Sequence, residues 1–241
     1  MLISTVNFSL YYAALRNRDP RVIVRSIQFR VLTGFVVIAV TVLTVLNLSV
    51  HPDPIVSFRK SFFFVATTIS STGYSADDYT AYDSTALAIM VLMMFVGGCS
   101  GSTAGGMKID RFILMAKQAL AQIQRNFRPA AVQVVRMGRA VINPQVLSDV
   151  TAFVVVYMAC MGAGILAVTF IEGVPFATAF GAMLTFLSNM GPAPFHELAG
   201  LPDNFSLYSG TSKAIFCVAM LLGRLEFLAL FALLVPSFWR R

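Results

Sequence analysis

The stretch Phe95-Val-Gly-Gly-Cys-Ser-Gly-Ser-Thr-Ala-Gly-Gly-Met-Lys108 places five glycines in an otherwise apolar part of the chain: Gly97, Gly98, Gly101, Gly105 and Gly106. Each glycine costs a helix about 1 kcal/mol relative to alanine, so the stretch predicts a broken helix. Broken backbone at membrane depth is tolerated only where it is buried in protein or lines a water-filled cavity. We therefore predict an unwound helix beside a polar pathway. The alternative is a hinge in a packed helix, although small-residue packing needs two spaced glycines rather than a cluster.

The composition is that of an integral membrane protein, because 57% of the 241 residues are hydrophobic and only 12% are charged. Cys99, Cys160 and Cys217 are too widely separated to predict a disulfide framework or a zinc knuckle. His51 and His196 lie in separate loops, so no metal cluster is expected. Basic residues, rather than a small-residue cleavage site, follow the first apolar residues, which argues against a signal peptide.

The hydrophobic runs fall into two length classes. Residues 31–50 and 150–171 are long and uncharged enough to cross a bilayer. The runs at 55–71 and 174–187 are too short, which predicts buried or re-entrant helices. Further helices are expected at residues 84–96, resuming over 107–124, and at 211–239. We therefore predict an all-α integral membrane protein with four spanning helices and two re-entrant helices.

This order repeats along the chain: a long span, a short re-entrant segment, a glycine turn, an acidic loop and a second span. Gly73 and Gly191 occupy matching places in the two copies. The repeat predicts one unit over residues 1–142, which includes the N-terminal flank, the glycine stretch and a basic connection, and a second unit over 143–241. Internal repeats built on short hydrophobic segments indicate a membrane transport site.

The charges are distributed unevenly between the loops. Basic residues cluster over 16–30, 108–139 and 240–241, which by the positive-inside rule makes that side, with both termini, cytoplasmic. The net charge of +7 therefore does not indicate a nucleic-acid partner. Acids dominate the opposite loops and would raise the local cation concentration at a pore mouth: they are Asp53, Asp77, Asp78, Asp83, Glu172, Glu197 and Asp203. For any single acid, an ordinary solvated loop is the alternative.

The glycine turns suit a cation pathway. A cation entering a pore loses water, and backbone carbonyls aimed at one axis can replace that water. Glycine allows conformations that turn carbonyls inward. A short helix followed by Thr72-Gly73-Tyr74, or by Asn189-Met190-Gly191, could supply such carbonyls.

Several motifs together resemble the TrkH/KtrB family of potassium-uptake channels. They are the run from Phe64 to Ser75, the glycine stretch, Ser188-Asn-Met-Gly-Pro192, Gly223-Arg-Leu-Glu226, the Asn7-Phe8 segment and the loop from Arg128 to Arg136. The resemblance covers nearly the whole chain. That family is built from four consecutive units, each with a helix, a pore helix with a filter loop, and a second helix. This chain resembles the third and fourth units.

The resemblance assigns roles to the motifs. Thr72, Gly73 and Tyr74 would form one filter strand, and Asn189, Met190 and Gly191 another, with carbonyls of Thr72, Gly73, Asn189 and Met190 binding potassium. Gly97, Gly98, Gly101, Gly105 and Gly106 would form an intramembrane gate loop. Glycine rather than serine at both filter places is similar to the potassium-selective pattern.

Two basic residues join the predicted gate. An arginine within a span usually faces a cavity or a partner. The resemblance implies that Arg224 points into the pore beneath the filter as an electrostatic barrier. A structural ion pair is its alternative, although Glu226 leaves the helix on a different face. Lys108 would help to hold the gate loop or would anchor the helix at the interface.

The resemblance further implies a homodimer in the cell membrane, with a cytoplasmic nucleotide-binding regulatory subunit. The basic face would suit that partner or anionic membrane lipid. The transported ligand would be potassium, with no covalent cofactor. Two of four filter strands are absent, so the chain would be a fragment, a truncated reading frame, or one that needs a complementary half. Two copies completing a ring, a non-conducting structural subunit and a sodium-permeable channel remain as alternatives.

An enzyme is not predicted. Cys99, Ser100 or Ser102 could suggest a nucleophile, but both histidines lie on the opposite side of the membrane, out of reach as a base. The sequence Gly101-Ser-Thr-Ala-Gly-Gly-Met-Lys108 also departs from a phosphate-binding loop, because its lysine does not follow glycine directly and Ile109 replaces Ser or Thr.

Overall fold

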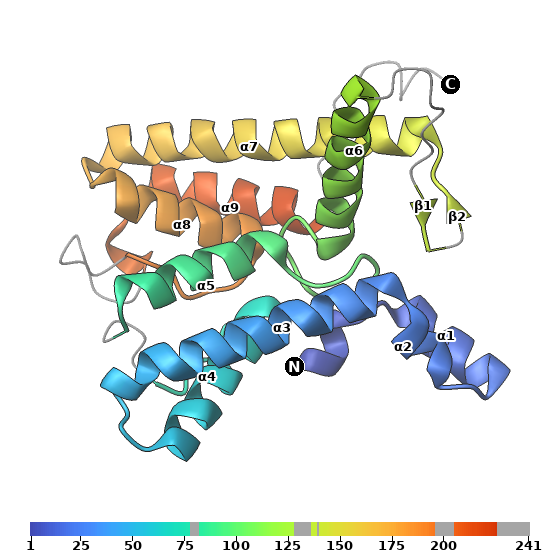
Figure 1. Ribbon diagram of the computed structural model, residues 1–241. Coiled ribbons are helices and arrows are strands. Elements are labelled where there is room, and N and C mark those ends of the chain that lie inside the picture. The colour runs from blue at the N-terminus through green and yellow to red at the C-terminus, as the bar shows by residue number, and fades with distance from the viewer. Residues whose placement is uncertain (78–81, 128–135, 139, 196–204, 226–241) are drawn as a thin grey trace, which may run out of the picture.

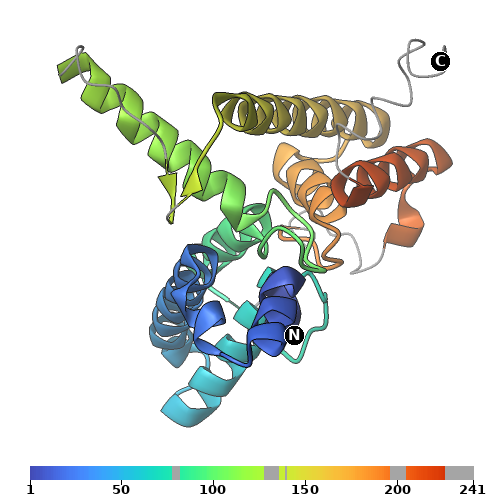
Figure 2. The ribbon, with the colours of Figure 1, turned by 90° about the vertical axis from the view of Figure 1, so that its right-hand side faces the viewer.

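The computed structural model describes residues 1–77, 82–127, 136–138, 140–195 and 205–225, and within them two helical units (Figure 1). In each unit a long helix is followed by a shorter helix, an extended turn and a third helix. Figure 2 shows the two units on either side of the glycine-rich segment. The fold is mostly helical, as predicted.

The first unit consists of α3 (Ile27–Leu46), a 3-10 turn η2 (Asn47–Ser49), α4 (Pro54–Ile69) and α5 (Ser84–Val96). Asp53 and Asp83 cap α4 and α5, because their carboxylates accept the amide protons of Ile55 and Thr85 at 2.9 and 3.2 Å. Polar contacts join α3 to α4, among them Asn47 Nδ2 to Ser61 Oγ at 3.0 Å.

The second unit consists of α7 (Pro144–Glu172), α8 (Phe176–Ser188), a 3-10 turn η5 (Phe205–Leu207) and α9 (Gly210–Leu225). Asn143 caps α7 by accepting the amide proton of Gln145 at 3.0 Å, and Gly173 ends the helix in a left-handed conformation. The predicted last span over 211–239 lies outside the described residues beyond Leu225.

Shorter elements flank the units. The chain begins with a 3-10 turn η1 (Leu2–Thr5), α1 (Phe8–Asn17) and α2 (Arg21–Arg25). Between the units lie α6 (Ile109–Phe127) and a small antiparallel hairpin of β1 (Arg136–Met137) and β2 (Ala140–Val141), in which Arg136 pairs with Val141. The hairpin departs from the all-α prediction, and Gly138, with φ of 63°, makes its turn.

The core lies where α4, α5 and α8 meet. Its fully buried side chains include Val65, Ile69, Met90, Met93 and Leu184. Flexible methionines fill the irregular gaps between helices that cross at an angle. Tyr157 of α7 is also completely buried, and its ring lies 6.3 Å from that of Phe95. The two units therefore share one packed interior.

Among the described helices, α3 with η2 (Ile27–Ser49) and α7 (Pro144–Glu172) are long and apolar enough to cross a membrane. Both begin before the predicted runs, at residues 27 and 144 rather than 31 and 150. They expose large apolar side chains, including Ile38, Leu166 and Phe170, which is 91% exposed. The predicted span over 84–96 is a helix of 13 residues, shorter than a bilayer requires. Its continuation, α6, leaves in a different direction (Figure 1).

Candidate functional site: two glycine turns above a glycine loop

The first turn, residues 70–75, follows the end of α4. Ser71 has a left-handed φ of 53°, and Gly73 follows with φ of 78°. The Thr72 amide donates to the Thr67 carbonyl at 3.0 Å, which ends the helix with a wide turn. This bond closes the end of α4, and residues 72–75 follow outside the helix.

The second turn, residues 188–192, has the same backbone path at the end of α8. Asn189 has φ of 53° and Gly191 has φ of 107°, while the Met190 amide donates to the Thr185 carbonyl at 3.1 Å. One constant offset in residue number relates Thr67 to Thr185, Ser71 to Asn189 and Gly73 to Gly191. Ser71, which the sequence reasoning did not select, is therefore the counterpart of Asn189, and Tyr74 is the counterpart of Pro192.

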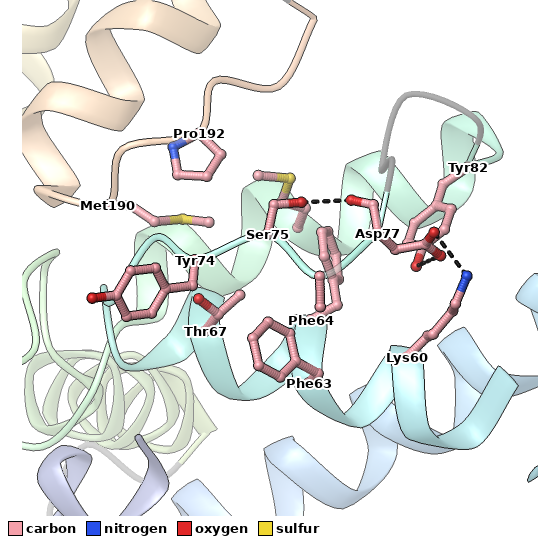
Figure 3. Close-up of a pocket in the computed structure, with 12 residues that line it drawn as sticks. Lys60, Phe63, Phe64, Thr67, Tyr74, Ser75, Asp77, Tyr82, Met190 and Pro192 are labelled. Atoms are coloured by element: carbon pink, nitrogen blue, oxygen red, sulfur yellow. Dashed lines mark hydrogen bonds and ion pairs between the residues drawn. The ribbon is translucent and has the colours of Figure 1, made fainter. Parts of the chain in front are cut away.

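The two turns meet backbone to backbone. A Cβ atom added to Gly73 would overlap the Met190 carbonyl oxygen, so only glycine permits this approach. A Cβ atom on Gly191 would lie 3.8 Å from the Cα atom of Gly73, which is ordinary contact. Met190 is buried, whereas Tyr74 is 67% exposed, and both flank the meeting point in Figure 3. The turns that the sequence predicted as filter strands are therefore neighbours in space.

The glycine loop, residues 97–108, separates α5 from α6. Hydrogen bonds close its base: the Met107 amide donates to the Phe95 carbonyl at 3.1 Å, and the Ile109 amide donates to the Gly98 carbonyl at 2.9 Å. Asp110, 6% exposed, accepts the amide proton of Ser100 at 2.6 Å. The loop therefore has a defined conformation, although it breaks the helix as the sequence predicted.

The glycine loop lies against both turns. The Gly105 amide donates to Ser71 Oγ at 3.0 Å, and a Cβ atom on Gly105 would overlap the Ser188 carbonyl oxygen. Ser188 in turn donates its hydroxyl proton to the Met94 carbonyl at 3.0 Å. Gly105 is thus the point where loop and turns are closest. Gly97, Gly101 and Gly106 have positive φ, and Gly98 packs against the carbonyl of Thr5.

The N-terminal segment binds the other side of the glycine loop. The Cys99 amide donates to the Thr5 carbonyl at 2.9 Å, and the Phe8 amide donates to the Gly101 carbonyl at 3.0 Å. A third bond joins the Thr103 amide to the Ser4 carbonyl at 3.3 Å. Sequence reasoning noted the Asn7-Phe8 motif but missed these contacts, because residues about 100 positions apart give no local signal.

Arg224 reaches the glycine loop from α9. Its guanidinium donates to the Thr103 carbonyl at 2.5 Å. Gly223, beside it, lets α9 approach the Leu187 carbonyl, where a Cβ atom would overlap. The Asn189 side-chain amide donates to the Met220 carbonyl at 3.2 Å, which fixes α9 to the second turn. Glu226, the predicted companion, lies outside the described residues. Lys108 lies at the end of the loop, next to α6, with φ of 68°.

The described side chains bring no three His, Cys, Asp or Glu residues together as a metal group. The oxygen atoms at the turns include the carbonyls of Met190 and Ser188 and the hydroxyl of Ser71. Such donors suit a weakly held, passing monovalent cation better than a resident transition metal.

Comparison with known proteins agrees with this geometry. The TrkH family model, described as a cation transport protein, matches residues 1–240. The Trk system potassium uptake protein TrkI of Halomonas elongata is 32% identical over 241 residues, which cover the whole of this chain and 48% of that protein. TrkH of Escherichia coli K12 is 29% identical over 242 residues, covering 49% of that protein.

A crystal structure of the potassium transporter TrkH from Vibrio parahaemolyticus has the same fold, with a TM-score of 0.89 and 28% identity over 99% of this chain and 51% of that one. The chain thus spans about half the length of the relatives it matches, and its placement as their third and fourth units stays a prediction. These relatives bear the names of potassium uptake proteins and not of enzymes, in agreement with the sequence. The match over nearly the full length shows that the chain belongs to the TrkH family of cation transport proteins.

Proposed function

We propose that the chain is a pore-forming subunit that carries potassium across the cell membrane, and that its two turns are strands of the ion filter. The observation that supports this most is the repeated turn itself. Each of two short helices is followed by a turn with two residues of positive φ, two positions apart. The backbones of the two turns meet at Gly73 and Met190. Close-packed carbonyls from several segments are what replaces the water shell of a potassium ion.

Two turns supply half of a four-strand ring. A ring of carbonyls desolvates an ion only when it surrounds the ion, so a complementary pair of units must complete the filter. The contact between Gly73 and Met190 joins the two turns of this chain, so the further strands of a closed ring would have to come from another chain or half. A complementary half of the same family is the partner that this proposal requires.

The glycine loop and Arg224 would form the gate beneath the filter. The loop touches both turns through Gly105, and Arg224 binds the loop at Thr103. A cationic side chain in an ion path raises the energy of a passing cation. Movement of Arg224 together with the loop would open the path.

The proposed orientation follows the charges. The basic segments α1, α2 and the far end of α6 lie toward one end of the bundle, and the turns after α3 and α7 lie toward the other (Figure 1). The basic end would face the cytoplasm. It would bind anionic lipid or a nucleotide-binding regulatory subunit of the Trk type, with two pores forming a homodimer.

Rubidium tracer uptake into liposomes tests the proposal, with this chain alone and with a two-unit complementary half of a family member. We expect uptake only when both halves are present, inhibited by excess potassium. Uptake by the chain alone would show that two copies complete the ring. Folded protein without uptake in either case would overturn the pore and favour a structural subunit, and equal inhibition by sodium would indicate a sodium-permeable channel.

Replacing Arg224 tests the gate separately. We expect Arg224→Ala to raise rubidium flux several-fold in the two-half assembly, because the barrier charge and the bond to Thr103 are both lost. Arg16→Ala, on the exposed surface of α1, is the matched control. Equal flux through Arg224→Ala and the control would remove the gate role.

A further inference from the structure

Three polar side chains surround Asp77, which follows the first turn: Lys60, His51 and Tyr82. Lys60 Nζ lies 2.8 Å from Asp77 Oδ1, and His51 Nε2 lies 2.7 Å from Asp77 Oδ2. The Tyr82 hydroxyl donates to Oδ2 at 3.1 Å. His51 Nε2 also lies 3.1 Å from Lys60 Nζ. Each side chain comes from a different segment, so Asp77 connects the α3–α4 turn, α4 and the start of α5.

The cluster controls where residues 74–77 run. Figure 3 shows this segment passing back along α4, from Thr67 near the end of the helix to Lys60 near its beginning. Phe63 and Phe64 of α4 line the pocket beneath the segment, and Ser75 donates its hydroxyl proton to the Asp77 carbonyl. The Lys60–Asp77 pair therefore holds the far end of the same strand that carries Gly73.

The electrostatics keep Asp77 charged. Burial alone would raise the pKa of Asp77, but hydrogen bonds from Lys60, His51 and Tyr82 outweigh burial and lower the pKa below its usual range. The ionised carboxylate neutralises the Lys60 ammonium. Both groups are about one-fifth exposed, with side-chain accessibilities of 24% for Lys60 and 20% for Asp77, so each is near solvent.

The second unit has a bond in the equivalent place. The offset that relates Gly73 to Gly191 also relates Lys60 to Thr178 and Asp77 to Phe195. The Thr178 hydroxyl donates to the Phe195 carbonyl at 3.4 Å. A link from the N-terminal half of the short helix to the segment after the glycine turn is thus present in both units, ionic in one and neutral in the other.

From this equivalence we infer that Lys60 and Asp77 are positioning residues for ion conduction: they brace the first filter strand against its pore helix, and Asp77 cancels the Lys60 charge at the pore mouth. The inference rests on the proposed function for its effect on ions, but the brace itself is a property of the fold. Without Asp77, the strand would lose its outer attachment and an unneutralised ammonium would repel entering cations.

Amide hydrogen exchange on the purified chain tests the brace without any transport. We expect Asp77→Asn to speed exchange at residues 72–76 by roughly threefold to tenfold, and to leave residues 189–191 unchanged. Asp83→Asn is the matched control, because Asp83 is an exposed acid of the same loop. Asp83 caps α5, and asparagine can serve as the cap in its place. Equal exchange in both variants would overturn the brace.

Rubidium uptake by the two-half assembly tests the charge. Asp77→Asn is expected to raise the KM for rubidium about threefold or more with little change in maximal rate, because the Lys60 charge opposes entry. The double variant Lys60→Met with Asp77→Asn should return the KM toward that of the unmodified chain. The control double variant, Arg59→Met with Asp77→Asn, removes the charge of an exposed neighbour and should leave the KM raised. A merely structural pair would not give this recovery.

The two assays separate the failures. Faster exchange with an unchanged KM would overturn the charge role and retain the brace. An assembly that takes up no rubidium would overturn the proposed function together with the charge role, while the exchange result would still decide the brace.

Discussion

The two glycine turns have nearly the same backbone and very different surroundings. Both follow a short helix, and both pair a left-handed residue with a left-handed glycine two positions later. The first turn leads to a charged link between Lys60 and Asp77, while the second leads to a neutral link between Thr178 and Phe195. What the repeat preserves is the path of the chain, and the residues that hold this path are free to differ.

The difference follows from exposure. Thr178 is completely buried, where an ion pair would cost desolvation energy, whereas Lys60 and Asp77 remain partly in contact with solvent. In the same unit, Gly181 approaches the Pro194 carbonyl so closely that a Cβ atom would overlap it. The second turn is therefore held by packing and the first by charge.

The largest expected effect comes from the glycines where the turns meet. Gly73→Ala must place a side chain at positive φ, at about 1–2 kcal/mol, and must also displace the Met190 carbonyl, at about 1–3 kcal/mol more. Gly191→Ala carries only the first cost, because a Cβ atom there has space. In detergent, the midpoint temperature of thermal unfolding should therefore be well below that of Gly191→Ala for the Gly73→Ala variant.

Gly138→Ala provides the control, since Gly138 also has positive φ but lies in the hairpin with nothing within 4 Å of an added Cβ atom. It should behave like Gly191→Ala in the unfolding measurement, and it should leave rubidium uptake intact, because Gly138 lies outside the proposed filter. Equal losses of stability for Gly73 and Gly191 would mean that conformation alone, rather than the contact with Met190, requires glycine in the first turn.

Much of this arrangement follows from the sequence, and the remainder depends on tertiary contacts. The glycine density after Val96 predicts the broken helix, and the spacing of Gly73 and Gly191 predicts matching turns. The pairing of Lys60 with Asp77 could not be predicted, because in the sequence each residue is indistinguishable from an ordinary solvated charge and only the fold brings the two together. The role of Ser71 was missed because left-handed serine has no signal comparable to that of glycine.

A moderate effect is expected at the threonines within the short helices. Thr185 donates its hydroxyl proton to the Pro192 carbonyl at 2.7 Å, but its counterpart Thr67 has no protein partner for its buried hydroxyl among the described residues. Thr185→Val should cost about 1–2 kcal/mol, because the partly buried Pro192 carbonyl loses its donor. Thr67→Val should change stability by less than about 0.5 kcal/mol, since no protein hydrogen bond is lost. The midpoints of thermal unfolding measure both effects. A larger loss of stability in Thr67→Val than in Thr185→Val would contradict this prediction.

The smallest effect expected is a pH dependence confined to the first unit. Asp77 has a lowered pKa in the folded chain, so its contribution to stability is complete above the usual pKa of the group and is lost as pH falls through the lowered value. The difference in unfolding midpoint between the unmodified chain and Asp77→Asn should therefore be constant above about pH 5 and shrink as the pH falls through the usual pKa of an aspartate and then through the lowered pKa of Asp77. Lys60, His51 and Tyr82 are the titratable groups in contact with this carboxylate, so the same comparison is also made in a His51→Asn background, where the imidazole is absent.

The link between Thr178 and Phe195 in the second unit is the control, because a hydroxyl and a carbonyl do not titrate in this range. The difference in unfolding midpoint between the unmodified chain and Thr178→Val should therefore stay constant with pH. A constant difference for Asp77→Asn as well would mean that the carboxylate holds the first turn through its shape and hydrogen bonds and not through its charge.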